Sequence, residues 1–431
     1  MLCLGFLGWA EKSFADTHNA ASCSQADVSG AISSSSPGDT VSVPAGECAW
    51  TTGITVNKSV SIIGAGEGQT IINDNVADAW ASALFWMYPA CPNNLRISGM
   101  TINRALNRTN ESVGLYGNCS DWRVDHMTFN ASWNDSTATT RFVAIKNTDG
   151  HPQGLLDHLT FNKLGITSVN PILVRGGSDL GWAEAMNFGG SDWVFVEDSN
   201  FNFPADTGSM SFQDGAIDCS NGGKYVFRHN MVNGTETGNH GNDSLTSSCL
   251  AMEIYDNTFT NLGVDPTQAV HLRGGTALIF NNTITGNYTY AIGLQNYRSC
   301  QYGYCGNGVM CQDDPRGWCD GNASSDGNTS PIEAYHGWPC KDQIGRGTNQ
   351  DLHPLYQWNN TKNGVLVSDA TVRNAEYQSG GICYSTTHIQ AGRDYFNNIP
   401  MPDYTPYAYP HPLTVESDVT APAAPSGLSV Q

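Results

Sequence analysis

Charged side chains recur at one position in a family of short, strand-like runs. Alternate residues are apolar in every run, and the runs are FVAIKN (142–147), ILVRGG (172–177), AIDCSN (216–221), VHLRGG (270–275) and AIGLQN (291–296). Because successive side chains of a strand point to opposite faces, we expect the apolar residues to point inward and the charged ones outward. If the runs stack in register, Lys146, Arg175 and Arg273 stand above one another on one outer face, with Asp218 and His271 one position over.

These residue types suit the cleavage of an anionic sugar polymer. A lyase of such a polymer needs a cation to neutralise the uronate carboxylate and a base to remove the C5 proton. We therefore predict catalytic roles for Asp218, His271 and Arg273, and the substrate-binding candidates are Lys146, Arg175, His240 and Gln295. The alternative is that these side chains form ion pairs on a solvated face. The assignment also depends on register, because a shift of one residue would turn the catalytic candidates inward, where buried charges are costly.

Aromatic side chains are a second candidate for sugar binding, because their rings can stack on sugar rings. The residues in question are Trp122, Trp133, Trp182, Trp193, Trp318, Trp338, Tyr302, Tyr304 and Tyr335.

A repeated pattern indicates how the runs are positioned. A short β-type run, a polar pair and a second β-type run recur roughly every 25–40 residues, as in LRISGMTIN (95–103), WRVDHMTFN (122–130), GLLDHLTFN (154–162) and VFVEDSNFN (194–202). Periods of this length are typical of solenoids and propellers, but a propeller blade needs four strands and a steadier period. The pattern predicts an all-β fold, a right-handed parallel β-helix.

The polar pairs are candidates for either chemistry or structure. Asp125-His126 and Asp157-His158 occupy the same place in the repeat, and Glu197-Asp198 and Arg228-His229 follow them there. Recurrence at a turn favours a structural ladder of stacked polar side chains over a catalytic role.

The remaining segments suggest how the chain is organised. We expect one domain over 16–413, with a helical cap and first coil over 24–50 and a Pro- and Tyr-rich segment, 400–413, closing the other end of the stack. A cysteine-rich insertion at about 298–347 is a candidate wall of a cleft. Residues 1–15 are interpreted as a signal peptide. Residues 414–431 are interpreted as a linker, whose TAPAAPSGLSV string resembles the opening of a fibronectin type III module.

Cysteine usage favours export from the cell. Of 13 cysteines, removal of Cys3 with the leader leaves 12, an even number that is rare in cytosolic proteins outside metal sites. The spacings favour the disulfides Cys23–Cys48, Cys91–Cys119 and Cys219–Cys249 over a zinc site. A secreted or cell-surface location is therefore expected.

Asn-x-Ser/Thr sequons occur throughout the chain, although the same residue types are also common in turns between short strands. The candidates for glycosylation are Asn57, Asn107, Asn110, Asn118, Asn130, Asn134, Asn233, Asn242, Asn281, Asn287, Asn322, Asn328 and Asn359.

The net charge of −20 excludes some partners. Nucleic acid is not expected, because phosphate binding needs a basic face. No stretch after the leader is long and apolar enough to span a membrane. Clustered carboxylates leave Ca²⁺ as a candidate ligand, although no loop of EF-hand type is present.

Several segments together resemble the pectate-lyase-like right-handed β-helix superfamily: GDTVSVPAGECAW (38–50), SVSIIGAG (59–66), the VDHMTF-type runs and YAYPHPL (407–413). The resemblance implies the fold, but this superfamily includes lyases, hydrolases, esterases and non-catalytic adhesins. Asn147-Thr148-Asp149-Gly150 and Asn239-His240-Gly241 also look like two motifs of polygalacturonases, but the paired-aspartate and Arg-x-Lys motifs of that family are not evident.

Two functions follow from the sequence. The first is an extracellular protein that binds, and as a lyase or hydrolase cleaves, an acidic polysaccharide. The alternative is a non-catalytic structural or adhesive surface protein that self-associates into fibres, with the β-helix as a rod.

Overall fold

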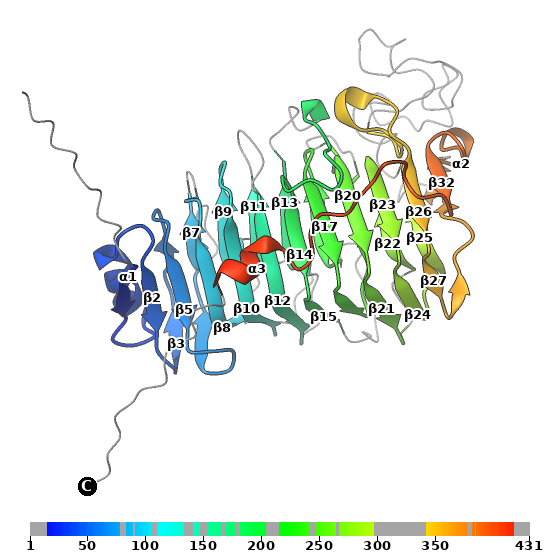
Figure 1. The fold of residues 1–431 in the computed structure, drawn as a ribbon. Helices are drawn as coiled ribbons and strands as arrows, with labels where there is room; N and C mark the ends of the chain where they lie inside the picture. The colour runs from blue at the N-terminus through cyan, green and yellow to red at the C-terminus, as the bar shows by residue number, and fades with distance from the viewer. Residues whose placement is uncertain are drawn as a thin grey trace, which may run out of the picture.

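The computed structural model describes residues 15–77, 83–88, 91–104, 110–132, 141–146, 153–164, 169–176, 182–203, 215–241, 247–263, 267–296, 342–376, 382–383 and 385–417. These residues form an all-β structure with large, almost entirely parallel sheets, shown in Figure 1.

Twenty of the described strands form the largest sheet. They are β1 (Thr17–Asn19), β2 (Thr40–Val43), β3 (Gly46–Trp50), β5 (Ser61–Gly64), β6 (Thr70–Asp74), β8 (Arg96–Arg104), β10 (Trp122–Ala131), β12 (Gly154–Lys163), β14 (Val194–Glu197), β15 (Asn200–Asn202), β17 (Lys224–Arg228), β18 (Met231–Asn233), β20 (Ala251–Tyr255), β21 (Thr258–Asn261), β23 (Thr276–Phe280), β24 (Thr283–Gly286), β26 (Leu355–Trp358), β27 (Thr361–Lys362), β28 (Val365–Leu366) and β32 (Tyr395–Asn397).

Two smaller parallel sheets contain the other strand family. The second sheet consists of β4 (Ile54–Thr55), β7 (Phe85–Met87), β9 (Val113–Tyr116), β11 (Val143–Lys146), β13 (Ile172–Arg175) and β16 (Ile217–Ser220). The third consists of β19 (Thr237–Gly238), β22 (Gln268–Leu272), β25 (Tyr290–Leu294) and β29 (Thr371–Val372). A short antiparallel pair is formed by β30 (Ala375–Glu376) and β31 (Ile382–Cys383).

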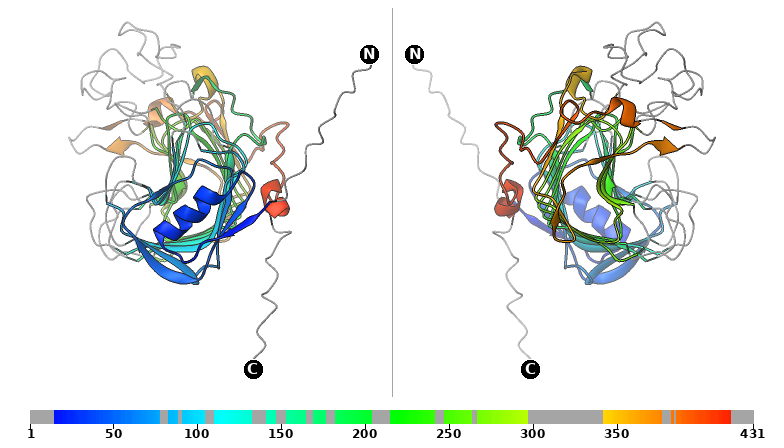
Figure 2. Two further views of the ribbon diagram at one scale, coloured as in Figure 1. Left: turned by 90° about the vertical axis from the view of Figure 1, so that its left-hand side faces the viewer. Right: turned by 90° about the vertical axis from the view of Figure 1, so that its right-hand side faces the viewer.

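Neighbouring strands of a sheet come from successive stretches of chain. Trp122 of β10 pairs with Gly154 of β12, 32 residues later, and Val143 of β11 pairs with Ile172 of β13, 29 residues later. Each stretch, called a layer below, thus contributes strands to the largest sheet and to one of the smaller ones. Viewed along the stack, the sheets enclose a common interior (Figure 2). Apolar side chains fill it, as where the rings of Phe129, Phe161 and Phe201 stack at centroid distances of 5.1 Å.

The polar pairs of the repeat lie where the chain bends between the two β-type runs of a layer. The second residue of each pair has a left-handed backbone conformation, with φ of 49° at His126, 51° at His158 and 50° at Asp198. Asn, Asp and His are the non-glycine types that tolerate this conformation best, which explains their recurrence there. The imidazoles of His126 and His158 stack at 4.7 Å. The predicted structural ladder is therefore present.

A ladder of buried asparagines follows this bend on the inner side, at Asn230, Asn257, Asn282 and Asn360. The Asn257 amide nitrogen donates to the carbonyl oxygens of Phe227 (2.8 Å) and Tyr255 (2.9 Å) and to Oδ1 of Asn282 (3.0 Å). The bend leaves backbone carbonyls without ladder partners, and these side chains satisfy them inside the protein.

The helix α1 (Gln25–Ser34) covers the end of the stack nearest the N-terminus, as predicted, and lies across that opening in Figure 2. Ser24 caps it by accepting a hydrogen bond from the Asp27 amide at 3.2 Å. Val28, Ala31 and Ile32 are its buried residues. Other short helices in the described ranges are η4 (Thr348–Gln350), α2 (Ser385–His388) and α3 (Pro412–Ser417).

The C-terminal segment does not close the far end of the stack, and that expectation was wrong. Residues 401–417 run back along the outer face of the largest sheet, past β17 and β14 to α3 beside β12 and β10 (Figure 1). The sheet holds them through buried charges: Arg228 donates to the carbonyls of Tyr407 (2.6 Å) and Ala408 (2.7 Å). Tyr404 donates to Glu253 at 2.5 Å. The segment therefore covers a second apolar cluster outside the stack, which includes Phe195, Val226, Leu278 and Trp358.

The three predicted cysteine pairs are disulfides in the structure. Their Cα–Cα distances are 5.8 Å for Cys23–Cys48, 5.6 Å for Cys91–Cys119 and 5.2 Å for Cys219–Cys249. Each bond joins consecutive layers. Within the part of the chain that the structure describes, no helix is long and apolar enough to cross a membrane.

Replacement of Asn257 by Ala should destabilise the fold by about 2–3 kcal/mol, because it leaves buried carbonyl groups of two layers without a donor. The exposed neighbour Thr258, replaced by Ala, is the matched control and should change stability by less than about 0.5 kcal/mol. Chemical denaturation followed by circular dichroism measures both changes. Equal effects of the two substitutions would contradict the structural role of the inner ladder.

Candidate functional site

The outer face of the second sheet carries a column of polar side chains at the ends of its strands. The register pairs Tyr116 of β9 with Lys146 of β11, Lys146 with Arg175 of β13, and Arg175 with Ser220 of β16. The apolar partners at alternate positions, such as Val143 and Ile145, are fully buried. The predicted register of β11, β13 and β16 is therefore the one in the structure.

Lys146 and Tyr116 are in direct contact. The Nζ atom of Lys146 donates to the Tyr116 hydroxyl at 2.6 Å, and the hydroxyl donates to the carboxylate of Glu111. Glu111 is 1% exposed, and its second oxygen lies 3.4 Å from Lys146 Nζ. A buried carboxylate thus supports an amine and a phenol, whose side chains are only partly buried.

The surroundings lower the pKa of Lys146 and raise the pKa of Tyr116. Burial is the largest influence on Lys146 and lowers its pKa, while the Glu111 carboxylate opposes this effect. The positive charges of Arg141 and Arg175 lower it further. Burial, the charge of Glu111 and its hydrogen bond all raise the pKa of Tyr116. Lys146 therefore gives up its proton more easily than an ordinary lysine, and Tyr116 keeps its proton.

Aromatic rings adjoin this pair on the preceding layers. Trp86 of β7 lies 4.6 Å from the Tyr116 ring and 5.6 Å from Tyr88, and Tyr88 is 37% exposed. The space for these groups depends on Gly114, where an added Cβ would lie 2.9 Å from the Tyr116 ring and 3.0 Å from the Glu111 carboxylate. This glycine therefore leaves room for the carboxylate and the rings.

The sugar-stacking prediction does not hold for the tryptophans that the structure describes. Trp122, Trp182 and Trp193 are at most 4% exposed, because Trp122 packs in the interior cluster and the other two pack in the second apolar cluster. Other aromatics named for this role, Trp133, Trp318, Trp338, Tyr302, Tyr304 and Tyr335, lie outside the described residues.

Asp218 lies two strands from Lys146 and is 9% exposed. Its carboxylate contacts Nδ1 of His240 at 3.3 Å and the guanidinium of Arg141 at 3.2 Å. Burial is the largest single influence on Asp218 and by itself raises its pKa, whereas the hydrogen bond and charge of His240 lower it. With the charges of Arg141 and Arg273 acting in the same direction, the pKa of Asp218 is well below its usual range. Asp218 is thus a counter-ion rather than a general acid.

His271 belongs to a separate group on the third sheet. Its Nδ1 lies 3.1 Å from Glu236, and its Nε2 lies 2.8 Å from Oε1 of Gln295. The second sheet continues into the third through the Gly215–Glu236 bridge. His271 is therefore four strands from Lys146, or about 19 Å at ~4.8 Å per strand.

The predicted site residues thus fall into two groups. Asp218, Arg273 and His240 share one charged cluster, and Arg141 links it to Lys146 and Arg175. Arg273 itself follows β22, the strand of His271, and its Nε donates to the Asn239 carbonyl at 2.8 Å. His271 and Gln295 lie beyond it. Sequence reasoning missed Tyr116, Glu111 and Arg141. The run VGLY (113–116) has the same alternation as the charged runs and would have identified Tyr116, whereas Glu111 and Arg141 lie before strands and carry no such signal.

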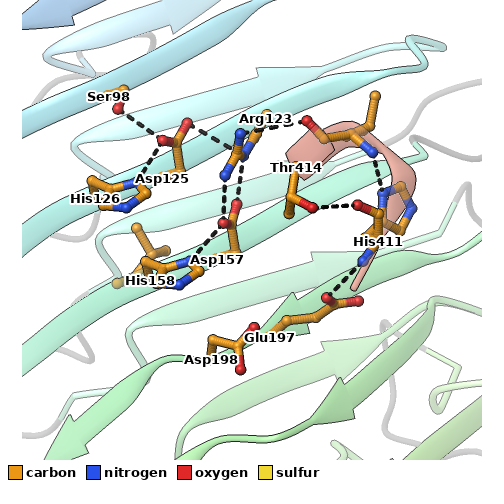
Figure 3. A network of polar contacts seen from close by, with 12 residues as sticks. Ser98, Arg123, Asp125, His126, Asp157, His158, Glu197, Asp198, His411 and Thr414 are labelled. Carbon is orange, nitrogen blue, oxygen red and sulfur yellow. Dashed lines mark hydrogen bonds and ion pairs between the residues drawn. The ribbon is translucent and has the colours of Figure 1, made fainter. Parts of the chain in front are cut away.

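The Asp-His pairs are on the largest sheet, away from this face, and bind its own arginines (Figure 3). Arg123 forms a two-bond ion pair with Asp157, at 2.8 and 2.7 Å, and Asp125 does the same with Arg96. Arg123 also donates to the carbonyl of Leu413 in the C-terminal segment at 3.4 Å. These charges hold the sheet and the segment together, which explains their burial without a catalytic role.

Other predicted features are only partly within the described residues. No group of three or more His, Cys, Asp or Glu side chains placed to hold a metal ion occurs in the described ranges. Residues 147–150, the leader segment 1–14, most of the cysteine-rich insertion and residues 418–431 lie outside them. α3 continues to Ser417, beyond the expected domain boundary at residue 413.

The sequons differ in accessibility. Asn57, Asn118, Asn281, Asn287 and Asn359 are exposed. Asn130 and Asn233 are half-buried in an outer ladder, where their amide nitrogens donate to Asn103 (2.8 Å) and Asn202 (3.1 Å). That nitrogen is the atom to which a glycan would be attached. In these two sequons it is instead used in hydrogen bonds between neighbouring strands of the sheet. Asn110 is half-buried, and Asn107, Asn134, Asn242, Asn322 and Asn328 lie outside the described residues.

Comparisons with known proteins give little direct guidance. No family model matches the chain, and no curated protein matches it significantly. Among solved structures, the chain is similar to an alginate lyase from Paenibacillus sp. str. FPU-7, with a TM-score of 0.37 and 14% identity over 62% of this chain and 95% of that one. A likeness of this size carries no argument about activity, which must come from the site.

Replacement of Glu111 by Gln should lower the pKa of Lys146 further, because the nearby carboxylate favours the protonated amine. Acylation of Lys146 requires the neutral amine, so the midpoint of its pH-dependent labelling, followed by peptide mass spectrometry, should move to lower pH. Glu47→Gln is the control, because it removes an exposed carboxylate from the largest sheet. An unchanged midpoint in Glu111→Gln would contradict the assigned geometry.

Proposed function

We propose that this protein is an extracellular lyase of an acidic polysaccharide, built on a right-handed parallel β-helix. The observation that carries the proposal is the contact between Lys146 and Tyr116 above the buried Glu111, next to Arg141 and Arg175.

The β-helix is supported by the parallel sheets and the succession of layers around one interior. Connections between parallel strands of one sheet are right-handed in nearly all proteins, which supports that hand here. The disulfides support an extracellular location, since cytosolic thiols are kept reduced. The exposed sequons are compatible with it.

Charge favours an anionic polymer as the ligand. The protein has a net charge of −20, yet Arg141, Lys146, Arg175 and Arg273 gather on one face. Glu111 and Asp218 offset part of this charge from buried positions and leave the cations partly exposed. A uronate carboxylate placed over Arg141 and Arg175 would gain charge-assisted hydrogen bonds, and the rings of Trp86 and Tyr88 would adjoin a neighbouring sugar.

The pair can supply both proton transfers of a lyase. Neutral Lys146 removes the C5 proton, and the electron pair of that bond forms the C4–C5 double bond as the C4–O4 bond breaks. Tyr116 donates its phenolic proton to O4. The Lys146 ammonium then returns a proton to the Tyr116 phenolate through their 2.6 Å hydrogen bond, which restores both groups. The arginines stabilise the negative charge that develops on the uronate.

Replacement of Lys146 by Ala, or of Tyr116 by Phe, should lower kcat by about 10²–10⁴-fold, the range typical of a lost general base or acid. Incubation of the full chain with uronic-acid polymers, followed by near-ultraviolet absorbance of 4,5-unsaturated ends, measures this. Retention of full activity in both variants would remove the pair from the reaction. New reducing ends without the absorbance would indicate a hydrolase, and ordered fibres without activity on any polymer would support the rod alternative.

Arg175→Ala should weaken polymer binding and make it less salt-sensitive, because one cation of the binding face is lost. A charge-assisted hydrogen bond contributes about 1.5–3 kcal/mol when desolvated, or up to about 100-fold in KM, and less when exposed. Lys362→Ala is the matched control, because it also removes one positive charge, but from a lysine on the largest sheet that donates to the Thr289 carbonyl. Equal loss of binding in both variants would point to net charge and not to this face.

A further inference from the structure

The acid and the base proposed above lie on the same side of any bound sugar. Tyr116 and Lys146 end neighbouring parallel strands, β9 and β11, and pair in register. Their alternate neighbours Leu115 and Ile145 are fully buried, so both polar side chains project from the same outer face. The two functional atoms are 2.6 Å apart and in hydrogen-bond contact.

This separation is too small for a sugar ring to lie between the two groups. A ring with van der Waals contacts on both faces would hold the flanking atoms about 7 Å apart, twice the ~3.5 Å of one contact. The side chains are also held in place from below, because Glu111 binds both and packs with the Tyr116 ring closely over the backbone of Gly114. Proton removal and proton donation must therefore occur on one face of the sugar.

We propose that the reaction is a syn elimination, and that the substrate is a 4-linked uronate polymer in which the C5 hydrogen and O4 lie on the same face of the ring. This inference rests on the proposed lyase function. D-mannuronate and D-glucuronate have that relation, whereas L-guluronate and D-galacturonate have the C5 hydrogen and O4 on opposite faces.

The charges of the site make no such distinction. Each of these uronates carries one carboxylate, so Arg141 and Arg175 attract all four polymers. Discrimination between the polymers comes from the positions of Lys146 and Tyr116. When the C5 hydrogen and O4 lie on opposite faces of the ring, one of them is beyond the reach of these two side chains. Loss of one proton transfer costs a factor of about 10²–10⁴. We therefore expect selectivity in kcat and much less selectivity in binding.

Polymannuronate and polyguluronate provide the test, because their sugars differ only in configuration at C5. The full chain is incubated with each of them, and with polyglucuronate and polygalacturonate, while near-ultraviolet absorbance reports unsaturated ends and calorimetry reports binding. We expect cleavage of the mannuronate or glucuronate polymer at least about 100-fold faster than of the other two. Binding of the guluronate polymer without cleavage would locate the discrimination in the proton transfers.

Faster formation of unsaturated ends from polyguluronate or polygalacturonate would overturn the syn inference and leave the lyase proposal standing. Unsaturated ends from none of the four polymers would instead overturn the lyase proposal, and the inference with it. Tyr116→Phe is the internal check, because it should slow the cleavage of the preferred polymer and leave its binding within a few-fold of the original protein.

Discussion

In-register stacking of parallel strands is the constraint on which the rest of this structure depends. Each strand lies about 4.8 Å from the next, so equivalent residues of successive layers become columns of touching side chains. Inside, the columns are apolar, as in the stack of Phe129, Phe161 and Phe201. Outside, the same rule brings Tyr116, Lys146 and Arg175 together, although the first and last are 59 residues apart in the chain. A slip of one residue would bury these charges.

The register is held by polar groups at the bends as well as by the core. Left-handed residues such as His126 and Asp198 turn the chain at the same point in each layer, and the inner asparagines bind the carbonyls that the turn exposes. Disulfides tie three pairs of layers. These contacts fix the strands that carry Lys146 and Tyr116 relative to one another, which the proposed site requires.

The two outer faces use charge in different ways. On the largest sheet, Arg123, Asp157, Glu197 and Arg228 are buried beneath the C-terminal segment and satisfied by it and by one another, so their charges serve cohesion. On the second sheet, Glu111 is buried but Lys146 keeps 23% of its side chain exposed. A buried counter-charge beneath a partly exposed cation shifts the proton affinity of that cation at the surface.

The sequence by itself determined the all-β fold, the inward and outward faces of the strands, the polar ladder and the three disulfides, because period-two alternation and layer-length spacing are local signals. It also identified Lys146 and Arg175 as neighbours on one outer face. Only the tertiary structure decided that Glu111 and Arg141 join them, that His271 is too far away, and that 401–417 covers a sheet and not an end. These outcomes depend on contacts between residues far apart in the chain, which no local pattern encodes: Glu111 reaches Lys146 across 35 residues, and Arg228 reaches Tyr407 across 179.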